Sequence, residues 1–155
     1  MPSDSRVTLL VAEDDPDDRL LISDALERAR LANDLHFVED GEELIDYLLR
    51  EGRYRDPKTS PRPLLLFLDL NMPKMDGREA IARIRSVPEL RSLPVVVLTT
   101  SSAQEDIDAL YRLGANSYIV KPVSFDGLVR VLGDVGRYWL EIVELPDAAR
   151  ASTAA

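Results

Sequence analysis

The stretch LLLFLDLNMPKMDG, residues 64–77, joins a continuous apolar run to a polar segment that begins at Asp69. An uninterrupted apolar run of this length is typical of a strand in a parallel sheet that helices cover on both faces. Asp76 is a residue type that caps helices, and apolar residues at helical spacing follow it from Ala80. The stretch therefore predicts a central strand, a polar loop and a helix, with Asp69 at the end of the strand.

The same alternation of short apolar runs and helical stretches continues along the rest of the chain. The expected strands cover residues 7–12, 35–39, 64–69, 95–99 and 117–120, and the expected helices start at Pro16, cover about 42–50, follow Asp76, end at Gly114 and cover about 125–143. This order predicts an α/β fold: a doubly wound five-stranded parallel sheet with helices on both faces and an extended fifth helix.

Size and composition favour one compact domain. The chain has 155 residues, of which 45% are hydrophobic and 30% are charged, as in an ordinary globular domain. We expect this domain to cover residues 1–146, with no attached output domain, and residues 147–155 to form a flexible tail. Residues 51–63 are rich in proline and charge, so we expect an exposed loop there.

The composition also disfavours several classes of function. The chain has no cysteine, which excludes disulfides, thiolate metal sites and cysteine nucleophiles. Its net charge of −9 repels phosphate backbones, so we expect no direct binding of nucleic acid. No apolar run approaches the length of a membrane span, and the first residues do not resemble a secretory signal. We therefore expect a cytoplasmic protein without membrane contact, and we interpret His36 as a partly buried strand residue.

Four of the expected strands end in carboxylates, hydroxyls or an ammonium group. These residues are Glu13, Asp14 and Asp15 after the first strand, Asp69 and Asn71 after the third, Thr99, Thr100 and Ser101 at the fourth, and Lys121 after the fifth. In an open parallel sheet the carboxyl ends of the strands form the crevice where ligands bind. The pattern therefore predicts a polar site at this edge, although Asp15 and Asp76 also suit a purely structural role as helix caps.

The carboxylates of this predicted site repel one another unless a cation or shifted pKa values relieve the repulsion. Mg²⁺ prefers oxygen ligands and takes one or two carboxylates together with phosphate oxygens. An aspartate, a divalent ion, a hydroxyl and a lysine at one point suit phosphoryl transfer, in which positioning and charge neutralisation do most of the work. We interpret Asp69 as the nucleophile that forms an acyl phosphate.

These residues resemble the receiver domains of two-component response regulators over roughly residues 7–143. The likeness lies in Glu13 and Asp14 after LLVA, in LLLFLDLNMPKMDG around Asp69, in PVVVLTT around Thr99, and in Tyr118 shortly before Lys121 and Pro122. It implies a flavodoxin-like strand order, 2-1-3-4-5. The long loop at 51–63 and the YWLEIVELP ending are similar to the single-domain regulators that partner bacterial and cyanobacterial phytochrome kinases. Glu13 departs from the family pattern, since many receivers have Asp there.

The resemblance implies a role for each residue of the site. Asp69 is the expected phosphoacceptor; Asp14, Asp69 and the backbone carbonyl of Asn71 are the expected Mg²⁺ ligands, with Glu13 acting largely through water. Thr99 and Lys121 are expected to contact the phosphoryl oxygens. Thr99 and Tyr118 are the expected switch pair, because a loop drawn toward the phosphoryl group lets Tyr118 turn inward. Asn71 and Ser101 are expected to tune autodephosphorylation, and the Lys121–Pro122 bond is expected to be cis.

The expected partners follow from the same resemblance and from the fifth helix. A sensor histidine kinase, of the bacteriophytochrome type, is expected to supply the phosphoryl group. The apolar residues Tyr138, Trp139, Ile142 and Val143 extend beyond the length that covers a five-stranded sheet. An exposed apolar end usually marks a partner surface. We therefore expect a homodimer through the fourth helix, the fifth strand and the fifth helix, and a signal that leaves by this surface.

Three other functions compete with a phosphorylation switch. A phosphohydrolase resembling haloacid dehalogenases would use Asp69 as its nucleophile, but the chain has DLN in place of the Asp-x-Asp pattern and no inserted cap domain. A flavin carrier of the same strand order would need hydroxyl and amide groups in its first loop, whereas EDDPDD presents carboxylates that repel phosphate. A structural interaction module without phosphorylation is the third alternative, and residue spacing alone does not exclude it.

Overall fold

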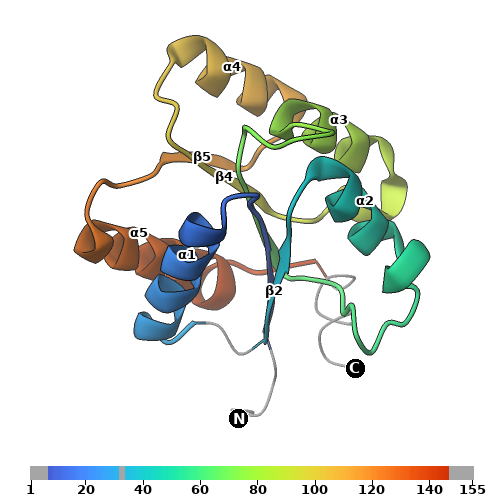
Figure 1. Ribbon diagram of the computed structural model, residues 1–155, viewed down its shortest axis with the longest axis horizontal. Coiled ribbons are helices and arrows are strands. Elements are labelled where there is room, and N and C mark those ends of the chain that lie inside the picture. Colours follow the sequence, from blue (N-terminus) through green and yellow to red (C-terminus); the bar gives the residue numbers. More distant parts are fainter. Residues whose placement is uncertain (1–6, 32–33, 147–155) are drawn as a thin grey trace.

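The computed structural model describes residues 7–31 and 34–146, which form a five-stranded parallel sheet with helices on both faces (Figure 1). The strand order is β2-β1-β3-β4-β5, which confirms the predicted fold class. The strands are β1 (Thr8–Ala12), β2 (Asp34–Val38), β3 (Leu65–Leu68), β4 (Val95–Thr99) and β5 (Ser117–Val120), and the α-helices are α1 (Pro16–Arg28), α2 (Gly41–Leu49), α3 (Gly77–Ser86), α4 (Gln104–Leu113) and α5 (Phe125–Arg137). Each strand lies within one residue of its predicted bounds, and β4 and β5 match them without a shift.

The two faces of the sheet are covered by different helices (Figure 1). Successive strand residues point to opposite faces, so Leu10 belongs to one core cluster and Leu9 to the other. The first cluster joins the sheet to α2, α3 and α4, and the second joins it to α1 and α5. Strands β1, β3 and β4 are buried along their whole length, which explains why all their residues are apolar except Thr8 at the start of β1 and Thr99 at the end of β4.

Capping side chains fix where the helices begin. Asp15, Asp40, Asp76 and Ser124 each accept a hydrogen bond from a backbone amide in the first turn of the helix that follows. Gly114 ends α4 in the left-handed region, with φ of 116°, as the sequence predicts. The caps leave the acidic residues of the β1–α1 and β3–α3 loops at the carboxyl edge of the sheet.

The fifth helix differs from its prediction in its last part. The α-helix ends at Arg137, and the segment η3 (Tyr138–Ile142) continues it as a π-helix. Trp139 packs against the core cluster beneath α1 and α5, while Tyr138 and Ile142 are exposed. The predicted helix 125–143 is therefore helical as far as Ile142, in two geometries, and Trp139 of the π-helical part packs onto the core.

The segment 51–63 is mostly exposed, as predicted, but it is not a simple loop. It contains the 3₁₀ turn η1 (Gly52–Tyr54), and Ser60 is almost completely buried. The Ser60 hydroxyl lies 2.7 Å from the Tyr54 carbonyl oxygen and 2.8 Å from that of Asp56. The Tyr47 hydroxyl, from α2, donates to the Pro61 carbonyl oxygen at 2.7 Å. These contacts fold the segment back on itself and attach it to α2.

Within the described part of the chain, no helix has both the length and the apolar character that crossing a bilayer requires. The predicted tail, residues 147–155, lies outside the described residues.

Candidate acidic site at the carboxyl edge of the sheet

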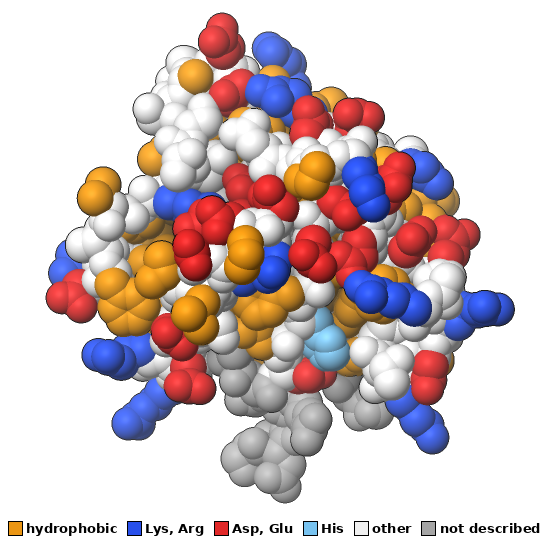
Figure 2. Space-filling view, in the orientation of Figure 1, with side chains coloured by type: hydrophobic (Ala, Val, Ile, Leu, Met, Phe, Trp, Pro, Cys, Tyr) orange, Lys and Arg blue, Asp and Glu red, His pale blue; other side chains and the backbone are white. Residues whose placement is uncertain are grey.

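Three carboxylates from two loops meet at the carboxyl edge of the sheet. Glu13 and Asp14 follow β1, and Asp69 follows β3, the strand beside it. One carboxylate oxygen of each lies within 4.8 Å of the others, a separation that a single divalent cation can bridge. Figure 2 shows acidic side chains gathered near the middle of this face, above the start of α1. The structure therefore brings together three of the four residues predicted to hold a metal.

Backbone contacts hold this acidic group in position. The Asp69 amide donates to the Ala12 carbonyl oxygen at 3.1 Å, which ties the two loops together where their strands end. The Arg19 guanidinium lies 3.0 Å from the Glu13 carbonyl oxygen and 3.2 Å from that of Asp14. Gly77 packs so closely that a Cβ atom there would lie 2.9 Å from the Asp69 carbonyl oxygen. The carboxylates are thus attached to a rigid frame rather than to free loops.

Lys121 reaches the acidic group from the end of β5. Its ammonium nitrogen lies 2.7 Å from Glu13 Oε1, 3.2 Å from Asp18 Oδ2 and 3.8 Å from Asp69 Oδ2. Its backbone amide donates to the Thr99 carbonyl oxygen at 2.7 Å, which places it beside the end of β4. One cation therefore serves several carboxylates, and the site as a whole remains negative.

The shifted pKa values of the site follow from this crowding. Burial raises the pKa of the Glu13 carboxyl from 4.5 to about 7; the hydrogen bond from Lys121 opposes this rise, and the negative charge of Asp69 adds to it. Burial on its own would lower the pKa of Lys121, but the hydrogen bond to Glu13 and the charges of Asp69 and Asp18 raise it. Lys121 is therefore charged at neutral pH, whereas Glu13 is poised between its two forms.

Thr99 is buried at the end of β4 with an unsatisfied hydroxyl. Its side chain is fully buried, and Thr99 Oγ1 is the single buried side-chain polar atom without a hydrogen-bond partner among the described residues. A buried hydroxyl without a partner costs about 1–3 kcal/mol. Such an orphaned donor beside a cluster of carboxylates and a lysine has the chemistry to bind an anion that enters the site.

The structure places the other predicted site residues around this centre. Asn71 is exposed in the β3–α3 loop. The Ser101 hydroxyl donates to Asp106 Oδ2 at 2.6 Å, so it is bonded to the first turn of α4. Tyr118 is half-buried against the core, and its hydroxyl donates to the Ser101 carbonyl oxygen at 2.9 Å. Tyr118 is therefore already turned inward in this structure.

One expectation for the site is wrong. All peptide bonds of the described residues are trans, including the Lys121–Pro122 bond that was expected to be cis. The trans form is favoured at X–Pro bonds by about 0.5–1 kcal/mol.

Several residues of the site were missed by sequence reasoning. Asp18 contacts Lys121, and Arg19 donates to the carbonyl oxygens of Glu13 and Asp14. Asp18 and Arg19 lie in the first turn of α1, where the sequence alone gives them the pattern of ordinary surface residues. The run EDDPDD was a usable signal for Asp18, because it places carboxylates on both sides of the helix start. Arg78 and Asp106 form an ion pair between α3 and α4, and their spacing in the sequence gives no signal of it.

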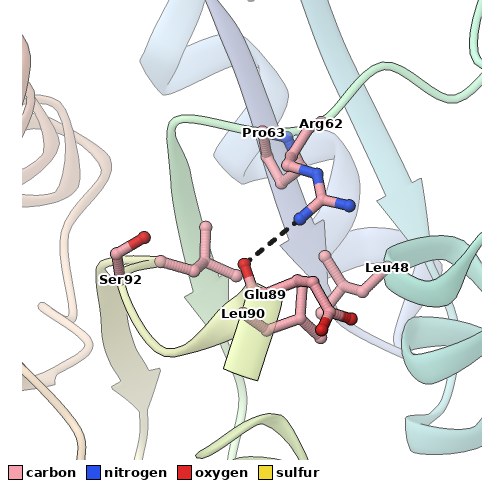
Figure 3. A pocket seen from close by; sticks show the side chains of 7 residues that line it. Leu48, Arg62, Pro63, Glu89, Leu90 and Ser92 are labelled. Carbon is pink, nitrogen blue, oxygen red and sulfur yellow. Dashed lines mark hydrogen bonds between the residues drawn. The ribbon is translucent and has the colours of Figure 1, made fainter. Parts of the chain in front are cut away.

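A small cavity lies away from the acidic site and has too little space for a ligand. It has a volume of about 20 Å³ and lies at the amino end of β3 and β4, where the Arg62 guanidinium donates to the Glu89 carbonyl oxygen (Figure 3). Its lining consists of Leu48, Arg62, Pro63, Glu89, Leu90, Ser92 and Leu93. A space of this size holds one water molecule. The acidic edge is therefore the better candidate for the chemistry.

Comparison with known proteins agrees with this geometry. Residues 9–132 match the family model of the response regulator receiver domain. The chain belongs to this receiver family. The receiver is a signalling domain of two-component systems, so the predicted family, fold and phosphoacceptor function in two-component signalling agree with the match.

Similar receivers match over nearly their whole length. The response regulator Rcp1 of Synechocystis sp. is 39% identical over 140 residues, which are 90% of this chain and 93% of Rcp1. The crystal structure of the phosphorylated cyanobacterial phytochrome response regulator RcpA has a TM-score of 0.84 and 38% identity, and the match covers 91% of this chain and 99% of that one. The Mn²⁺-bound form of Rcp1 has a TM-score of 0.80 and 38% identity, over 90% and 99% of the two chains.

Proposed function

We propose that Asp69 accepts a phosphoryl group from a phosphohistidine of a sensor kinase, and that the receiver signals through the resulting change of its surface. The observation that carries this proposal is the position of Lys121, 3.8 Å from Asp69 within a group of three carboxylates. In the transfer, an Asp69 oxygen bonds to phosphorus as the bond from phosphorus to the imidazole nitrogen breaks, so the histidine is regenerated. The same site catalyses loss of the phosphoryl group to water.

The cofactor that we propose is Mg²⁺. The donor set fits a hard cation, because Glu13, Asp14 and Asp69 offer only oxygen ligands at a spacing that one ion can bridge. Mn²⁺ in the similar regulator Rcp1 supports a divalent cation. Asp14, Asp69 and the Asn71 carbonyl are the proposed direct ligands, with Glu13 acting through water. When bound, the ion neutralises negative charge on the phosphoryl oxygens.

Two side chains are proposed to bind the phosphoryl oxygens. Lys121 supplies a charge close to Asp69, and Thr99 supplies a hydroxyl that has no other partner. Thr99 and Tyr118 form the proposed switch, since Tyr118 bonds to the loop that follows Thr99. Asn71 and Ser101 are proposed to tune autodephosphorylation from their positions two residues after Asp69 and Thr99.

The proposed kinase is a phytochrome-type photoreceptor, and the proposed compartment is the cytoplasm. RcpA, a phytochrome response regulator, supports this kinase assignment through its similarity along the chain. We also propose a homodimer through α4, β5 and α5. Tyr111, Val120, Tyr138 and Ile142, from this part of the molecule, are large exposed hydrophobic residues, which supports a partner surface there. Sedimentation that shows a monomer with and without phosphorylation would exclude the dimer.

Phosphotransfer from candidate sensor kinases tests the central proposal. Wild type and Asp69→Asn are incubated with each radiolabelled kinase and Mg²⁺, and the transferred label is counted. We expect label on wild type and none on the variant. Equal labelling of Asp69→Asn would place the acceptor elsewhere, and no labelling of wild type by any kinase or by acetyl phosphate would favour the interaction module without phosphorylation.

A further inference from the structure

The loop between β4 and α4 is anchored to α3 by a chain of side-chain contacts. Arg78, in the first turn of α3, forms an ion pair with Asp106 of α4. Asp106 accepts a second hydrogen bond, at 2.6 Å, from the Ser101 hydroxyl. Ser101 lies between Thr99, the last residue of β4, and the start of α4, so these contacts fix the middle of the loop that follows Thr99.

The contacts of Asp106 involve an ionised carboxylate. The hydrogen bond from Ser101 lowers the pKa of Asp106, and the Arg78 guanidinium lowers it further, so the carboxylate is ionised at neutral pH. Hydrogen bonds to an ionised group are about twice as strong as those between neutral groups. The residue that caps α4, Ala103, has no side chain that can accept a hydrogen bond from the first turn. The loop is therefore attached to α4 through the contact of Asp106 with Ser101 and not through a capping side chain.

Ser101 is held from both sides. Its hydroxyl bonds to Asp106, and its carbonyl oxygen accepts the hydrogen bond of the Tyr118 hydroxyl at 2.9 Å. The inward position of Tyr118 thus depends on where the loop places the Ser101 carbonyl. Nothing else among the described contacts engages the Tyr118 hydroxyl.

We propose that Arg78 and Asp106 are positioning residues that hold the β4–α4 loop, through Ser101, in the arrangement that receives a phosphoryl group. This inference rests on the proposed function of Asp69. In this arrangement the Tyr118 hydroxyl already bonds to the Ser101 carbonyl oxygen, while the buried Thr99 hydroxyl has no hydrogen-bond partner among the described residues. A contact present in the binding arrangement stabilises it, and loss of that contact lowers the population that is competent to bind.

The test measures binding of beryllium fluoride, an analogue of the phosphoryl group on Asp69, in the presence of Mg²⁺. We compare Asp106→Ala, Arg78→Met and Ser101→Ala with wild type by calorimetry, and we follow the bound fluoride by ¹⁹F NMR. Couplings of this kind change affinity by about fivefold or more, so we expect each variant to bind at least that much more weakly. The double variant of Ser101→Ala and Asp106→Ala is expected to lose less than the sum of the two single losses, because both substitutions remove the hydrogen bond between Ser101 and Asp106.

Asp108→Ala is the matched control. Asp108 lies in the same helix and also carries a carboxylate, but it bonds only to Gln104 Nε2 at 2.8 Å on an exposed face. We expect this variant to bind beryllium fluoride like wild type. A second readout separates positioning from general destabilisation. The affinity for Mg²⁺ alone, set by Glu13, Asp14 and Asp69, is expected to stay unchanged in the Arg78 and Asp106 variants.

The failure of this inference is distinct from that of the proposed function. If wild type binds beryllium fluoride, Asp69→Asn does not, and Asp106→Ala binds as tightly as Asp108→Ala, the anchor has no role and the proposal is overturned. A loss of Mg²⁺ affinity equal to the loss of beryllium fluoride affinity would likewise replace positioning by general destabilisation. If wild type binds no beryllium fluoride, or Asp69→Asn binds it equally, the proposed function itself fails.

Discussion

Replacing Glu13 with Gln should remove a pH-dependent cost from the metal-free fold. The Glu13 carboxyl has a pKa of about 7 in the folded chain and 4.5 as its ordinary value. Between these values the folded state binds more protons than the unfolded state, so the free energy of unfolding falls as pH rises through this window. From about pH 5 to about pH 8, the loss attributable to Glu13 amounts to about 2 to 3 kcal/mol. Glu13→Gln cannot ionise, so it escapes this loss.

The assay is urea unfolding of wild type and Glu13→Gln at several pH values, with a chelator present. In the difference between the two unfolding free energies, the contributions of carboxyl groups that do not contact Glu13 or its partners cancel. We expect it to shift by about 2 to 3 kcal/mol in favour of the variant as pH rises. Excess Mg²⁺ should restore wild-type stability at the higher pH, because it binds only the folded site. A difference that stays constant across this pH range would refute the raised pKa.

The same structure predicts three further effects. The affinity for Mg²⁺ should weaken by up to about tenfold between about pH 8 and pH 6, because Glu13, with a pKa of about 7, must lose its proton when the cation binds. An affinity that calorimetry finds independent of pH would contradict this. Gly77→Ala should cost about 1–3 kcal/mol in urea unfolding, because its Cβ would meet the Asp69 carbonyl oxygen at 2.9 Å; an unchanged midpoint would contradict that close approach. Ser60→Ala should lower the free energy of unfolding by about 1–3 kcal/mol, because it leaves the carbonyl oxygens of Tyr54 and Asp56 without their donor. Ser102→Ala, at an exposed position, is the neutral control.

The parts of the fold that the sequence predicts are those governed by local physics. Strands β3 and β4 are buried on both faces, so their residues are apolar up to Thr99 at the end of β4, and the pattern has one interpretation. Asp15 and Asp76 cap helices with side chains that lie next to them in the sequence. The carboxyl ends of parallel strands share one edge, so the meeting of Glu13, Asp14 and Asp69 follows from the topology.

The parts that the sequence does not predict depend on contacts between distant surfaces. Arg78 and Asp106 lie on different helices and resemble ordinary solvated charges until the packing of α3 against α4 brings them together. The π-helical geometry of η3 is likewise absent from the sequence pattern, which shows only that Trp139 has helical spacing, and not that it packs on the core beneath α1 and α5. Ser60 is polar and lies in a charged segment, so its burial is visible only once the carbonyls it satisfies are placed.

Buried groups that lower the stability of the fold lie together at the acidic site, where the proposed ligands bind. Three carboxylates, those of Glu13, Asp18 and Asp69, share the ammonium group of Lys121. Burial raises the pKa of Glu13 to about 7, and the Thr99 hydroxyl is buried without a partner among the described residues. Apart from Thr8 and Ser60, the other buried residues of the described core are apolar, and their burial offsets the local cost of the site. A divalent cation relieves the repulsion between the carboxylates, and a phosphoryl group gives Thr99 and Lys121 an acceptor. Both ligands therefore draw their affinity from interactions that the empty site leaves unsatisfied, so they should bind cooperatively at this edge.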